Sequence, residues 1–486
     1  MPLILGTNSI KDTGYDVANS LRFDGSSDYL NRNQGTQTND TKYTFSAWVK
    51  RSGVLGSSSV NEVLLGSFTS FTDTGYIRFE DQNDNLQVYD KYGSTIDLNY
   101  QTNMKFRDPN AWYHIVVNVD GSRSANQRCK IYVNGSEVSC SNTTDTGGTL
   151  GMKTSTDMRV GAINNSTGAS EYYFSGYMAE VYYIDGSGLD ASNFGEFNSD
   201  SPTIWQPKAY EGSFGNNGFY LDFENASSLG ADVSGNSNNF TVNNLTSIDQ
   251  TTDTCTNNFC TLNPLVAATS RTDNQNYSEG NTIIIPNSTD NYGTTFSTIG
   301  VQGSGKWYWE AQIVWNGTSN NANFPRTIGF VTEDYAFNYS YLGQDQESWG
   351  MMFSDETPDQ WFASHPDENN NEGGTMANGD TVNLALDLDN GYFYFGINGT
   401  YINSGNPTSG ASGTGAVFTL TATDLSKFII PAVTNATNTT YYKFNFGNPA
   451  YSISSGNSDA NGLGNFENAV PSGYFSLCSS NLADFG

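Results

Sequence analysis

The sequence predicts an all-β protein built from two antiparallel β-sandwiches joined by a loop-rich connector. First, the 486 residues are too many for one hydrophobic core, because a domain usually holds roughly 100 to 200 residues. Second, the 50 glycines stand among many Asn, Ser and Thr residues, which favour turns. Third, the apolar residues gather in short segments rich in aromatic and β-branched side chains, and no segment shows helical periodicity of ordinary length.

The charge of the chain excludes several classes of partner. The net charge is −29, and 14% of the residues are aromatic, including 29 Tyr and 29 Phe. An acidic disordered chain lacks this aromatic area, whereas a folded β protein needs it for its cores. The negative charge repels phosphate backbones and anionic lipids, and no basic cluster offsets it. We therefore expect no nucleic acid and no membrane among the partners.

The N-terminus shows no targeting signal. Its first residues, MPLILGTNSI, lack the basic and apolar regions of a signal peptide. No apolar run approaches the roughly 20 residues of a membrane-spanning helix. We expect synthesis in the cytoplasm without a signal peptide.

The first predicted sandwich occupies residues 15–215. Its strands are short and end at Gly, Asn, Ser or Asp turns, which is typical of a sandwich or barrel. We predict strands at 44–49, 112–119, 130–133, 158–161 and 177–184. Between two apolar segments, Asn134 and Gly135 predict a two-residue hairpin turn that pairs Val133 with Ser136.

The second predicted sandwich occupies residues 301–450. The stretch before it, 216–300, is rich in Asn, Thr and Ser and is predicted as a connector with some strands. From Trp307 and Trp309 onward, apolar residues recur with period 2, which marks one face of a strand as a core face. Residues 451–486 are predicted as a C-terminal extension.

The five cysteines allow at most two disulfides, and no Cys/His spacing predicts a zinc site. The expected hairpin register places Cys129 opposite Cys140, so a disulfide between them is one interpretation. Two unlinked, buried cysteines are the alternative, because the pair falls at a hydrogen-bonded position, where side chains lie farther apart. Cys255 and Cys260 are close enough in sequence to form a second pair.

Two sets of motifs occur in a characteristic order. The first is LRFDGSSDYL (21–30), TFSAWVK (44–50), AWYHIVVNVDG (111–121), KIYVNGSEV (130–138), MRVGAIN (158–164) and FSGYMAEVYYIDG (174–186). The second is GKWYWEAQI (305–313), SWG (348–350), GDTVNLALDLDNGYFYFGING (379–399), IIPAV (429–433) and FNFG (444–447). The first set resembles a laminin-G-like domain and the second a SPRY domain. The resemblance implies two concanavalin-A-like sandwiches, a jelly roll followed by a bent sandwich.

Further phrases extend the resemblance. They are the start MPLILGTNSI, NGFYLDF (217–223), TNNFCTLNP (256–264) and GNFENAVPSGYFSLC (464–478). With the two domains, they are similar to structural or fibre proteins of tailed bacteriophage virions, particularly marine ones. This similarity implies a protein made in the host cytoplasm and exposed on the virion surface. Its implied partners are other virion proteins, further copies of itself and host-surface polysaccharide, and segment 1–14 is a candidate for attachment to the particle.

Glycan sites combine aromatic rings with polar side chains, because sugars have apolar C–H faces and many hydroxyl groups. Most tryptophans here fall in predicted strands. Trp361 instead lies in the polar segment SDETPDQWFASHPDENNNEGG, predicted as a loop at the edge where a SPRY domain would present its ligand. We therefore name Trp361 and His365 as candidate ligand-binding residues.

A calcium ion is the one cofactor that the resemblance leaves open, because some laminin-G-like domains hold calcium with loop carboxylates. Asp73, Asp120, Asp157 and Asp185 lie near predicted strand ends. None of them belongs to an EF-hand-like series, so no metal ligands are assigned.

The sequence predicts no catalytic residue and no enzyme. Asp387 and Asp389 would share a strand face with their residues roughly 7 Å apart, and this separation lies within the range of the two carboxyl groups of an inverting glycosidase. Their position before the Asn390-Gly391 corner fits a turn-capping role better. His114 is interpreted as an ordinary strand residue within WYHIVV.

These observations predict a non-enzymatic virion structural protein, in the form of a fibre, spike or capsid appendage, that binds host-surface glycans during adsorption. One alternative is a scaffolding or protein-interaction module of the virion without glycan binding. A second alternative is a polysaccharide depolymerase, which would need paired carboxylates in a groove.

Overall fold

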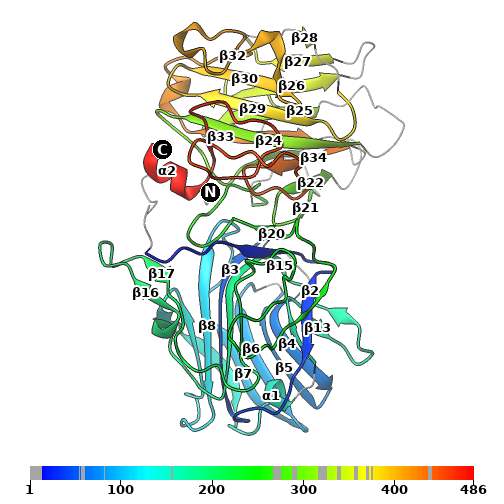
Figure 1. The fold of residues 1–486 in the computed structure, drawn as a ribbon, viewed down its shortest axis with the longest axis vertical. Helices are drawn as coiled ribbons and strands as arrows, with labels where there is room; N and C mark the ends of the chain where they lie inside the picture. Colours follow the sequence, from blue (N-terminus) through cyan, green and yellow to red (C-terminus); the bar gives the residue numbers. More distant parts are fainter. Residues whose placement is uncertain are drawn as a thin grey trace. The chain divides into compact units, whose positions relative to one another are not determined.

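The computed structural model of the chain divides into two compact units, with the boundary between Thr256 and Asn257 (Figure 1). Each unit consists of two principal β-sheets with almost entirely antiparallel pairing, which confirms the predicted all-β, two-sandwich fold. The structure describes residues 14–485 except 54, 56–60, 82, 155–156, 266–274, 287–292, 316–325, 337–340, 355–359, 368–370, 374–375 and 436–439.

The first sheet of the N-terminal unit has the order β10-β9-β8-β3-β15-β1-β20, with β18 paired to β15. Figure 1 shows β3, β8 and β15 within this unit, and backbone pairing places β3 between the other two. Asn134 and Gly135 adopt φ values of 47° and 79°, so the predicted hairpin forms and Val133 pairs with Ser136. The strands are β1 (Ser20–Asp24), β3 (Lys42–Arg51), β8 (Trp112–Asp120), β9 (Cys129–Val133), β10 (Ser136–Glu137), β15 (Ser175–Asp185), β18 (Phe219–Leu221) and β20 (Gln250–Thr251).

The second sheet of this unit has the order β11-β7-β6-β5-β4-β12-β2-β19. Its strands are β2 (Tyr29–Asn33), β4 (Glu62–Ser70), β5 (Asp73–Phe79), β6 (Leu86–Tyr92), β7 (Thr95–Thr102), β11 (Cys140–Asp145), β12 (Asp157–Val160) and β19 (Thr241–Asn243). Shorter elements complete the unit: α1 (Gly151–Thr154), β13 (Ile163–Asn164), β14 (Ser170–Glu171), η2 (Ala191–Asn193), β16 (Gly195–Phe197) and β17 (Trp205–Pro207). The hairpin of β13 and β14 packs closely against β4. At Gly66 of β4 the approach is so close that an added Cβ would lie 2.9 Å from the Cβ of Ile163.

A buried ion-pair network joins the two sheets of the N-terminal unit. Arg51 of β3 donates to the carboxylate of Glu62 in β4 at 2.6 Å and to Asp84, after β5, at 3.2 Å. The guanidinium also lies 4.4 Å from the ring centroid of Phe79. Burial raises the pKa of Glu62, and the adjacent Arg51 charge opposes that rise. Arg51 is therefore shared by two buried carboxylates, of which Asp84 also pairs with Arg107 at 2.7 Å.

The C-terminal unit has one sheet in the order β21-β22-β34-β24-β29-β30-β31, with β32 on β30 and β35 on β24. The other has the order β23-β33-β25-β26-β27-β28. Their strands are β21 (Gln275–Ser278), β22 (Ile283–Pro286), β23 (Gly293–Phe296), β24 (Lys306–Trp315), β25 (Arg326–Thr332), β26 (Ser348–Ser354), β27 (Gln360–Ser364), β28 (Asn371–Gly373), β29 (Thr381–Asp387), β30 (Tyr392–Ile397), β31 (Thr400–Tyr401), β32 (Phe418–Thr419), β33 (Ile429–Asn435), β34 (Thr440–Asn445) and β35 (Phe475–Ser476). The helices are η3 (Ile402–Ser404), η4 (Gly410–Ser412), η5 (Asp424–Ser426) and α2 (Ser479–Phe485). In the described part of the chain, no helix is long and apolar enough to cross a membrane.

Strand β24 is buried on both of its faces. Trp307 and Trp309 lie in the core between the sheets, as their period-2 spacing predicted. On the outer face, the C-terminal extension covers the strand, and the ring of Phe466 meets that of Tyr308 at 5.1 Å. The buried Glu310 carboxylate accepts hydrogen bonds from the Tyr308 hydroxyl at 2.7 Å and from the main-chain N–H groups of residues 467 and 468 at 2.9 and 2.7 Å. The extension is therefore part of the fold of this unit.

The segment 216–300, expected as a connector, supplies strands to both units. Strands β18, β19 and β20 add to the two sheets of the N-terminal unit, and β21, β22 and β23 add to those of the C-terminal unit. Of the expected attachment segment 1–14, residues 1–13 lie outside the described part of the chain.

Of the two interpretations of Cys129 and Cys140, the disulfide is wrong, because both thiols are free. Strand β10 ends at Glu137, and the chain then leaves the first sheet. Cys140 begins β11, where it pairs with Thr102 of β7 in the second sheet, whereas Cys129 stays in β9. The crossing between sheets ends the hairpin register that the prediction extended. The other three cysteines are also free.

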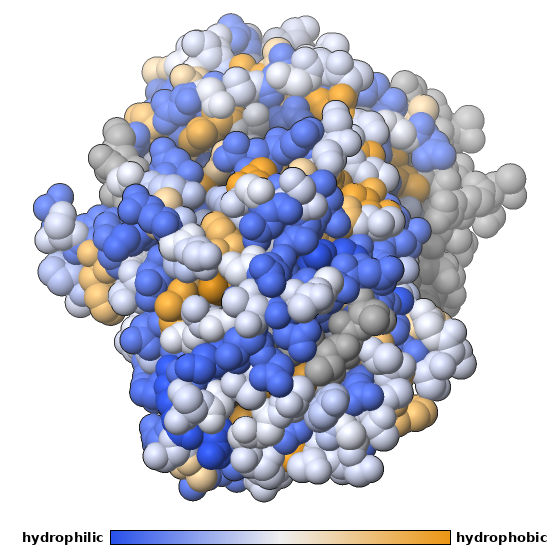
Figure 2. Space-filling view, turned by 60° about the horizontal axis from the view of Figure 1, so that its bottom comes forward, coloured by the Kyte–Doolittle hydropathy of each residue, from blue (hydrophilic) through white to orange (hydrophobic). Residues whose placement is uncertain are grey.

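Figure 2 shows one face of the molecule, on which hydrophilic residues dominate and apolar residues occur in small groups. This surface agrees with the net charge of −29. On a hydrophilic surface of this kind, a hollow lined by aromatic side chains is a candidate ligand site.

Candidate functional site

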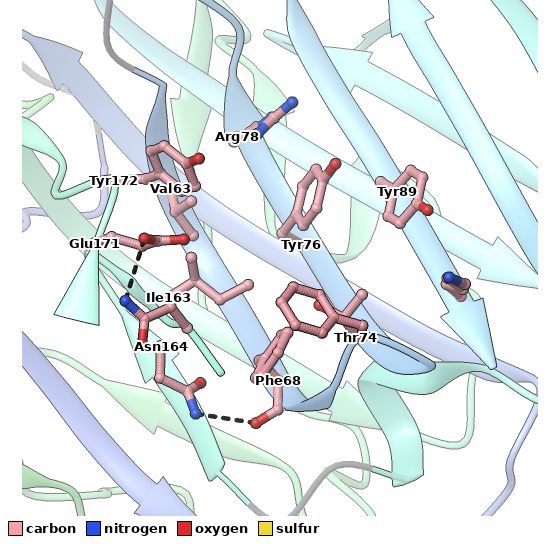
Figure 3. Close-up of a pocket in the computed structure, with 13 residues that line it drawn as sticks. Val63, Phe68, Thr74, Tyr76, Arg78, Tyr89, Ile163, Asn164, Glu171 and Tyr172 are labelled. Atoms are coloured by element: carbon pink, nitrogen blue, oxygen red, sulfur yellow. Dashed lines mark hydrogen bonds between the residues drawn. The ribbon is translucent and has the colours of Figure 1, made fainter. Parts of the chain in front are cut away.

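A pocket of about 360 Å³ opens on the outer face of the second sheet of the N-terminal unit. Strands β4, β5 and β6 form its base, and the β13–β14 hairpin forms one wall (Figure 3). Its lining is rich in aromatic rings but also carries amide and charged groups. The lining residues are Val63, Phe68, Phe71, Thr74, Tyr76, Arg78, Tyr89, Lys91, Ile163, Asn164, Asn165, Glu171 and Tyr172.

The strand period places the aromatic residues on this outer face. In β5, Ile77 and Phe79 point into the sandwich core and are fully buried. Tyr76 and Arg78 therefore take the opposite face, because side chains alternate along a strand. The register pairs Tyr76 directly with Tyr89 of β6, so their rings lie side by side.

The Tyr76 and Tyr89 rings form a parallel stack, with centroids 4.9 Å apart and an interplanar angle of 9°. Figure 3 shows Val63, Ile163 and Tyr172 on the side of Tyr76 away from Tyr89, and the Arg78 guanidinium carbon lies over the Tyr76 ring at 4.5 Å from its centroid. Burial raises the pKa of Tyr76 to about 12. At neutral pH its phenol is therefore uncharged and can donate or accept a hydrogen bond.

Apolar side chains make the floor and the rim of the pocket. Val63, Phe68 and Ile163 are buried and form a small cluster against Tyr76. Phe71 stands at the rim, where 71% of it is exposed and its ring meets the edge of Phe68 at 5.7 Å. A large exposed aromatic side chain beside a hollow is a common feature of binding sites.

Amide groups on the hairpin wall add hydrogen-bonding capacity. Asn164 donates from Nδ2 to the main-chain carbonyl of Phe68 at 3.0 Å, which fixes the amide orientation. Its Oδ1 is buried and has no hydrogen-bond partner among the described residues. Next to it, Asn165 donates to the carboxylate of Glu171 at 3.4 Å. The backbone of Tyr172 has a φ of 56°, a left-handed conformation that residues other than glycine rarely adopt. Such backbone conformations are often found at functional sites.

The candidate residues named from the sequence lie elsewhere, in the C-terminal unit. Trp361 was expected in an exposed loop, but it belongs to β27 and its side chain is fully buried, 4.6 Å from the ring of Phe395. His365 is 7% exposed and stacks on Trp349 at 4.8 Å. The expected exposed position of Trp361 is wrong, because its five-residue strand was hidden among polar residues. Parts of the surrounding segment, 355–359 and 368–370, lie outside the described residues.

The aspartates considered for calcium have other partners in the structure. Asp73 accepts a hydrogen bond from Gly93 N, Asp120 pairs with Lys42, Asp157 pairs with Arg159, and Asp185 accepts from Thr38 N and Asn217 N. Within the described ranges, no three His, Cys, Asp or Glu residues gather in a way that could hold a metal ion.

The carboxylates considered for catalysis shape a turn. Asp387 is buried and accepts from Lys306 at 2.7 Å and from the main chain and side chain of Asn390 at 3.1 and 2.9 Å. Asp389 accepts from the main-chain N–H of Gly305 at 2.8 Å. Both carboxylates therefore hold the corner after β29.

His114 has a structural position in β8. Its Nδ1 accepts from the indole N–H of Trp205 at 2.9 Å, and its Nε2 lies 2.9 Å from the hydroxyl of Ser46. The ring also stacks on Trp48 at 4.9 Å. Burial lowers the pKa of His114 to about 3, so the imidazole is neutral at physiological pH.

The pocket itself was missed by sequence reasoning. The available signal was the short alternation of Tyr76 and Arg78 with Ile77 and Phe79, which marks a strand with an aromatic outer face. The contribution of the β13–β14 wall had no such signal, because these strands have two residues each.

Comparisons with known proteins identify two regions of the chain. Residues 24–187 match the family model of the concanavalin A-like lectin/glucanases superfamily, and residues 306–448 match that of the SPRY domain. No curated protein matches the sequence.

Similar solved structures include the SPRY domain of human HERC1, at 17% identity over 33% of this chain and 86% of that one, with a TM-score of 0.24. A heptameric SAP-like pentraxin from Limulus polyphemus has 15% identity over 36% of this chain and 79% of that one, with a TM-score of 0.27. A Bacteroides ovatus protein provisionally assigned to carbohydrate binding has 17% identity over 48% of this chain and 59% of that one, with a TM-score of 0.32. The two family models define the domains: the chain carries a concanavalin A-like domain at residues 24–187 and a SPRY domain at residues 306–448.

Proposed function

We propose that the chain is a non-enzymatic glycan-binding protein and that the pocket on its concanavalin A-like domain is the binding site. The observation that carries this proposal is the aromatic lining of the pocket, in which the stacked rings of Tyr76 and Tyr89 lie together with the exposed Phe71, and amide groups lie on the opposite wall. Aromatic faces pack against the C–H faces of sugars, while amides and phenols bond to their hydroxyls. The volume of about 360 Å³ lies in the ordinary range of small-molecule sites.

The polar lining supports binding without cleavage. Glycosidases flank the scissile bond with two carboxyl groups about 5 to 10 Å apart. Glu171 is the one carboxylate among the described residues that line the pocket. A depolymerase mechanism at this site would therefore lack its second carboxyl group.

We also propose that the chain acts as an exposed fibre, spike or capsid appendage of a tailed bacteriophage, made in the host cytoplasm and present as a homo-oligomer alongside other virion proteins. The motif order of the sequence supports this proposal. A weak single site suits such a role, because many copies on one particle raise the effective concentration of neighbouring sites. Immunogold labelling of purified particles tests the location, and light scattering of the purified chain tests the oligomeric state.

The glycan-binding proposal is tested with two tyrosine variants of the full chain. Tyr76→Ala removes one of the aromatic rings that line the pocket. Tyr92→Ala is the matched control, because Tyr92 is the last residue of the neighbouring strand β6, is 44% exposed and does not line the pocket. Binding is measured by isothermal titration against host-surface polysaccharide, and the same mixtures are assayed for new reducing ends. We expect Tyr76→Ala to weaken binding about two- to ten-fold, in line with the energy of an aromatic contact, and Tyr92→Ala to leave it unchanged.

Equal effects of the two substitutions would show that the pocket is not the site. New reducing ends in the wild-type mixture would show that the chain is an enzyme. Absence of binding in the wild type would contradict the glycan-binding proposal altogether.

A further inference from the structure

Two cations line the pocket although the chain carries a net charge of −29. They are Arg78 of β5 and Lys91 of β6. Most other described basic side chains of this unit form ion pairs, as Lys42, Lys50 and Arg51 do. Among the described residues, neither Arg78 nor Lys91 has a carboxylate within 4.0 Å. Two unneutralised cations in one hollow of an acidic protein need a separate explanation.

The guanidinium of Arg78 is held in place by its neighbours but keeps hydrogen-bond donors that the described residues do not satisfy. Its Nε donates to Gln87 at 2.9 Å, and its Cζ lies 4.5 Å from the ring centroid of Tyr76 and 6.0 Å from that of Tyr172. No described residue accepts a hydrogen bond from its two terminal nitrogens. An arginine held in this way presents a fixed pair of donors that matches the two oxygens of a carboxylate or sulfate.

Lys91 marks the other end of the same face. It pairs across the strands with Thr74, four residues before Arg78 in β5. This separation corresponds to roughly 13 Å along the strand, because each residue advances about 3.3 Å. Tyr76 lies between them, so a saccharide that lies along this face would have a cation at each end.

We propose that the pocket selects acidic saccharides, whose carboxylate or sulfate group binds the guanidinium of Arg78 while the sugar ring packs against the aromatic lining of the pocket. This inference rests on the proposed glycan-binding function and specifies its ligand class. Lys91 contributes to saccharides long enough to carry a second anionic group. Asn165 and Glu171 on the hairpin wall are hydrogen-bonded to each other and carry oxygen acceptors. In this proposal they accept hydrogen bonds from the hydroxyl groups of the sugar.

The test compares three probes on the full chain at about 0.15 M salt, where charges farther apart than roughly 8 Å are screened. The probes are an oligogalacturonide, which carries carboxylates, dextran sulfate, which carries sulfates, and neutral dextran. The variants are Arg78→Gln and Lys91→Gln. Lys208→Gln is the control, because it removes the same charge from an exposed site outside the pocket. Melting temperatures verify that each variant is folded.

We expect at least one acidic probe to bind more tightly than neutral dextran. Arg78→Gln should weaken that probe about ten-fold or more, as for the loss of a charged hydrogen bond, whereas Lys208→Gln should not. The preferred acidic probe then distinguishes carboxylate from sulfate. Equal or tighter binding of neutral dextran would overturn the acidic selectivity and leave the glycan-binding function standing. Equal losses in Arg78→Gln and Lys208→Gln would also overturn it. If no glycan of any class binds, the proposed function fails together with this inference.

Discussion

We expect the stability of the N-terminal unit to fall between pH 7.5 and pH 5.0 through the titration of His114. In the folded chain, burial lowers the pKa of this imidazole to about 3 from an ordinary value of 6.5. Its Nδ1 accepts the indole N–H of Trp205, so protonation at that nitrogen would break the bond. The unfolded chain therefore takes up a proton in this pH range, and the folded chain does not.

The magnitude follows from the two pKa values. Because the folded value is depressed, the contribution of His114 is complete above about pH 6.5 and is lost progressively as the pH falls toward 3. At about 1.4 kcal/mol per pKa unit, the free energy of unfolding falls by about 2 kcal/mol at pH 5.0 through this group alone. The buried carboxyl groups of Glu62 and Glu180 act in the opposite direction, because burial raises their pKa values.

A variant isolates the His114 contribution from these opposing groups. His114→Gln keeps a polar side chain next to Ser46 and Trp205 but does not titrate in this range. Hydrogen exchange of peptides that cover β3 and β8 gives the opening free energy of this unit at both pH values, separately from the C-terminal unit. We expect the difference between wild type and variant to be about 2 kcal/mol larger at pH 7.5 than at pH 5.0.

A difference between wild type and His114→Gln that stays constant across the two pH values would refute this reasoning. It would mean that the imidazole titrates near its ordinary pKa in the folded chain. Wild-type stability on its own does not decide the matter, because the acidic groups change it too.

Four further perturbations have defined outcomes. Arg51→Met should lower the free energy of unfolding by about 3 to 5 kcal/mol in urea titrations, since it leaves the buried carboxylate of Glu62 without its cation, whereas Asp84 keeps Arg107; a loss under 1 kcal/mol would contradict the network. Glu310→Gln should make the C-terminal extension more sensitive to limited proteolysis, and unchanged cleavage would count against its anchoring role. Gly66→Ala should push the hairpin from β4 and weaken glycan binding, with equal binding in titrations as the opposing result. EDTA should leave glycan binding unchanged, because Arg78 and amides supply the polar contacts, and a loss would point to a metal.

The fold was predictable from the sequence wherever periodicity and turns agreed. Trp307 and Trp309 marked a core face by alternation, and Asn134 with Gly135 fixed a hairpin through backbone conformations that few other residue pairs accept. The burial of the opposite face of β24 was not predictable, because the covering segment follows more than 130 residues later in the chain. In the sequence pattern, Tyr308 and Glu310 therefore resemble surface residues, because the segment that covers them is distant in the chain.

The binding site was less predictable than the fold. Trp361 drew attention because its neighbours are polar, yet one short strand suffices to carry it into the core. The pocket depends instead on cross-strand register, which brings Tyr76 beside Tyr89, and on a hairpin whose strands are too short for a pattern. Register and loop packing are properties of the assembled sheet, so a linear pattern does not contain them.

The strands that lie outside the family-match limits have a practical consequence for dissecting this protein. Fragments cut at residues 24–187 and 306–448 would lose β18, β19, β20 and β22, together with the segment that covers β24. Their exposed sheet edges and bared aromatic residues would favour aggregation. Division between Thr256 and Asn257 keeps every sheet complete, so the boundary for expressing the halves separately, or for exchanging one of them between relatives, lies there.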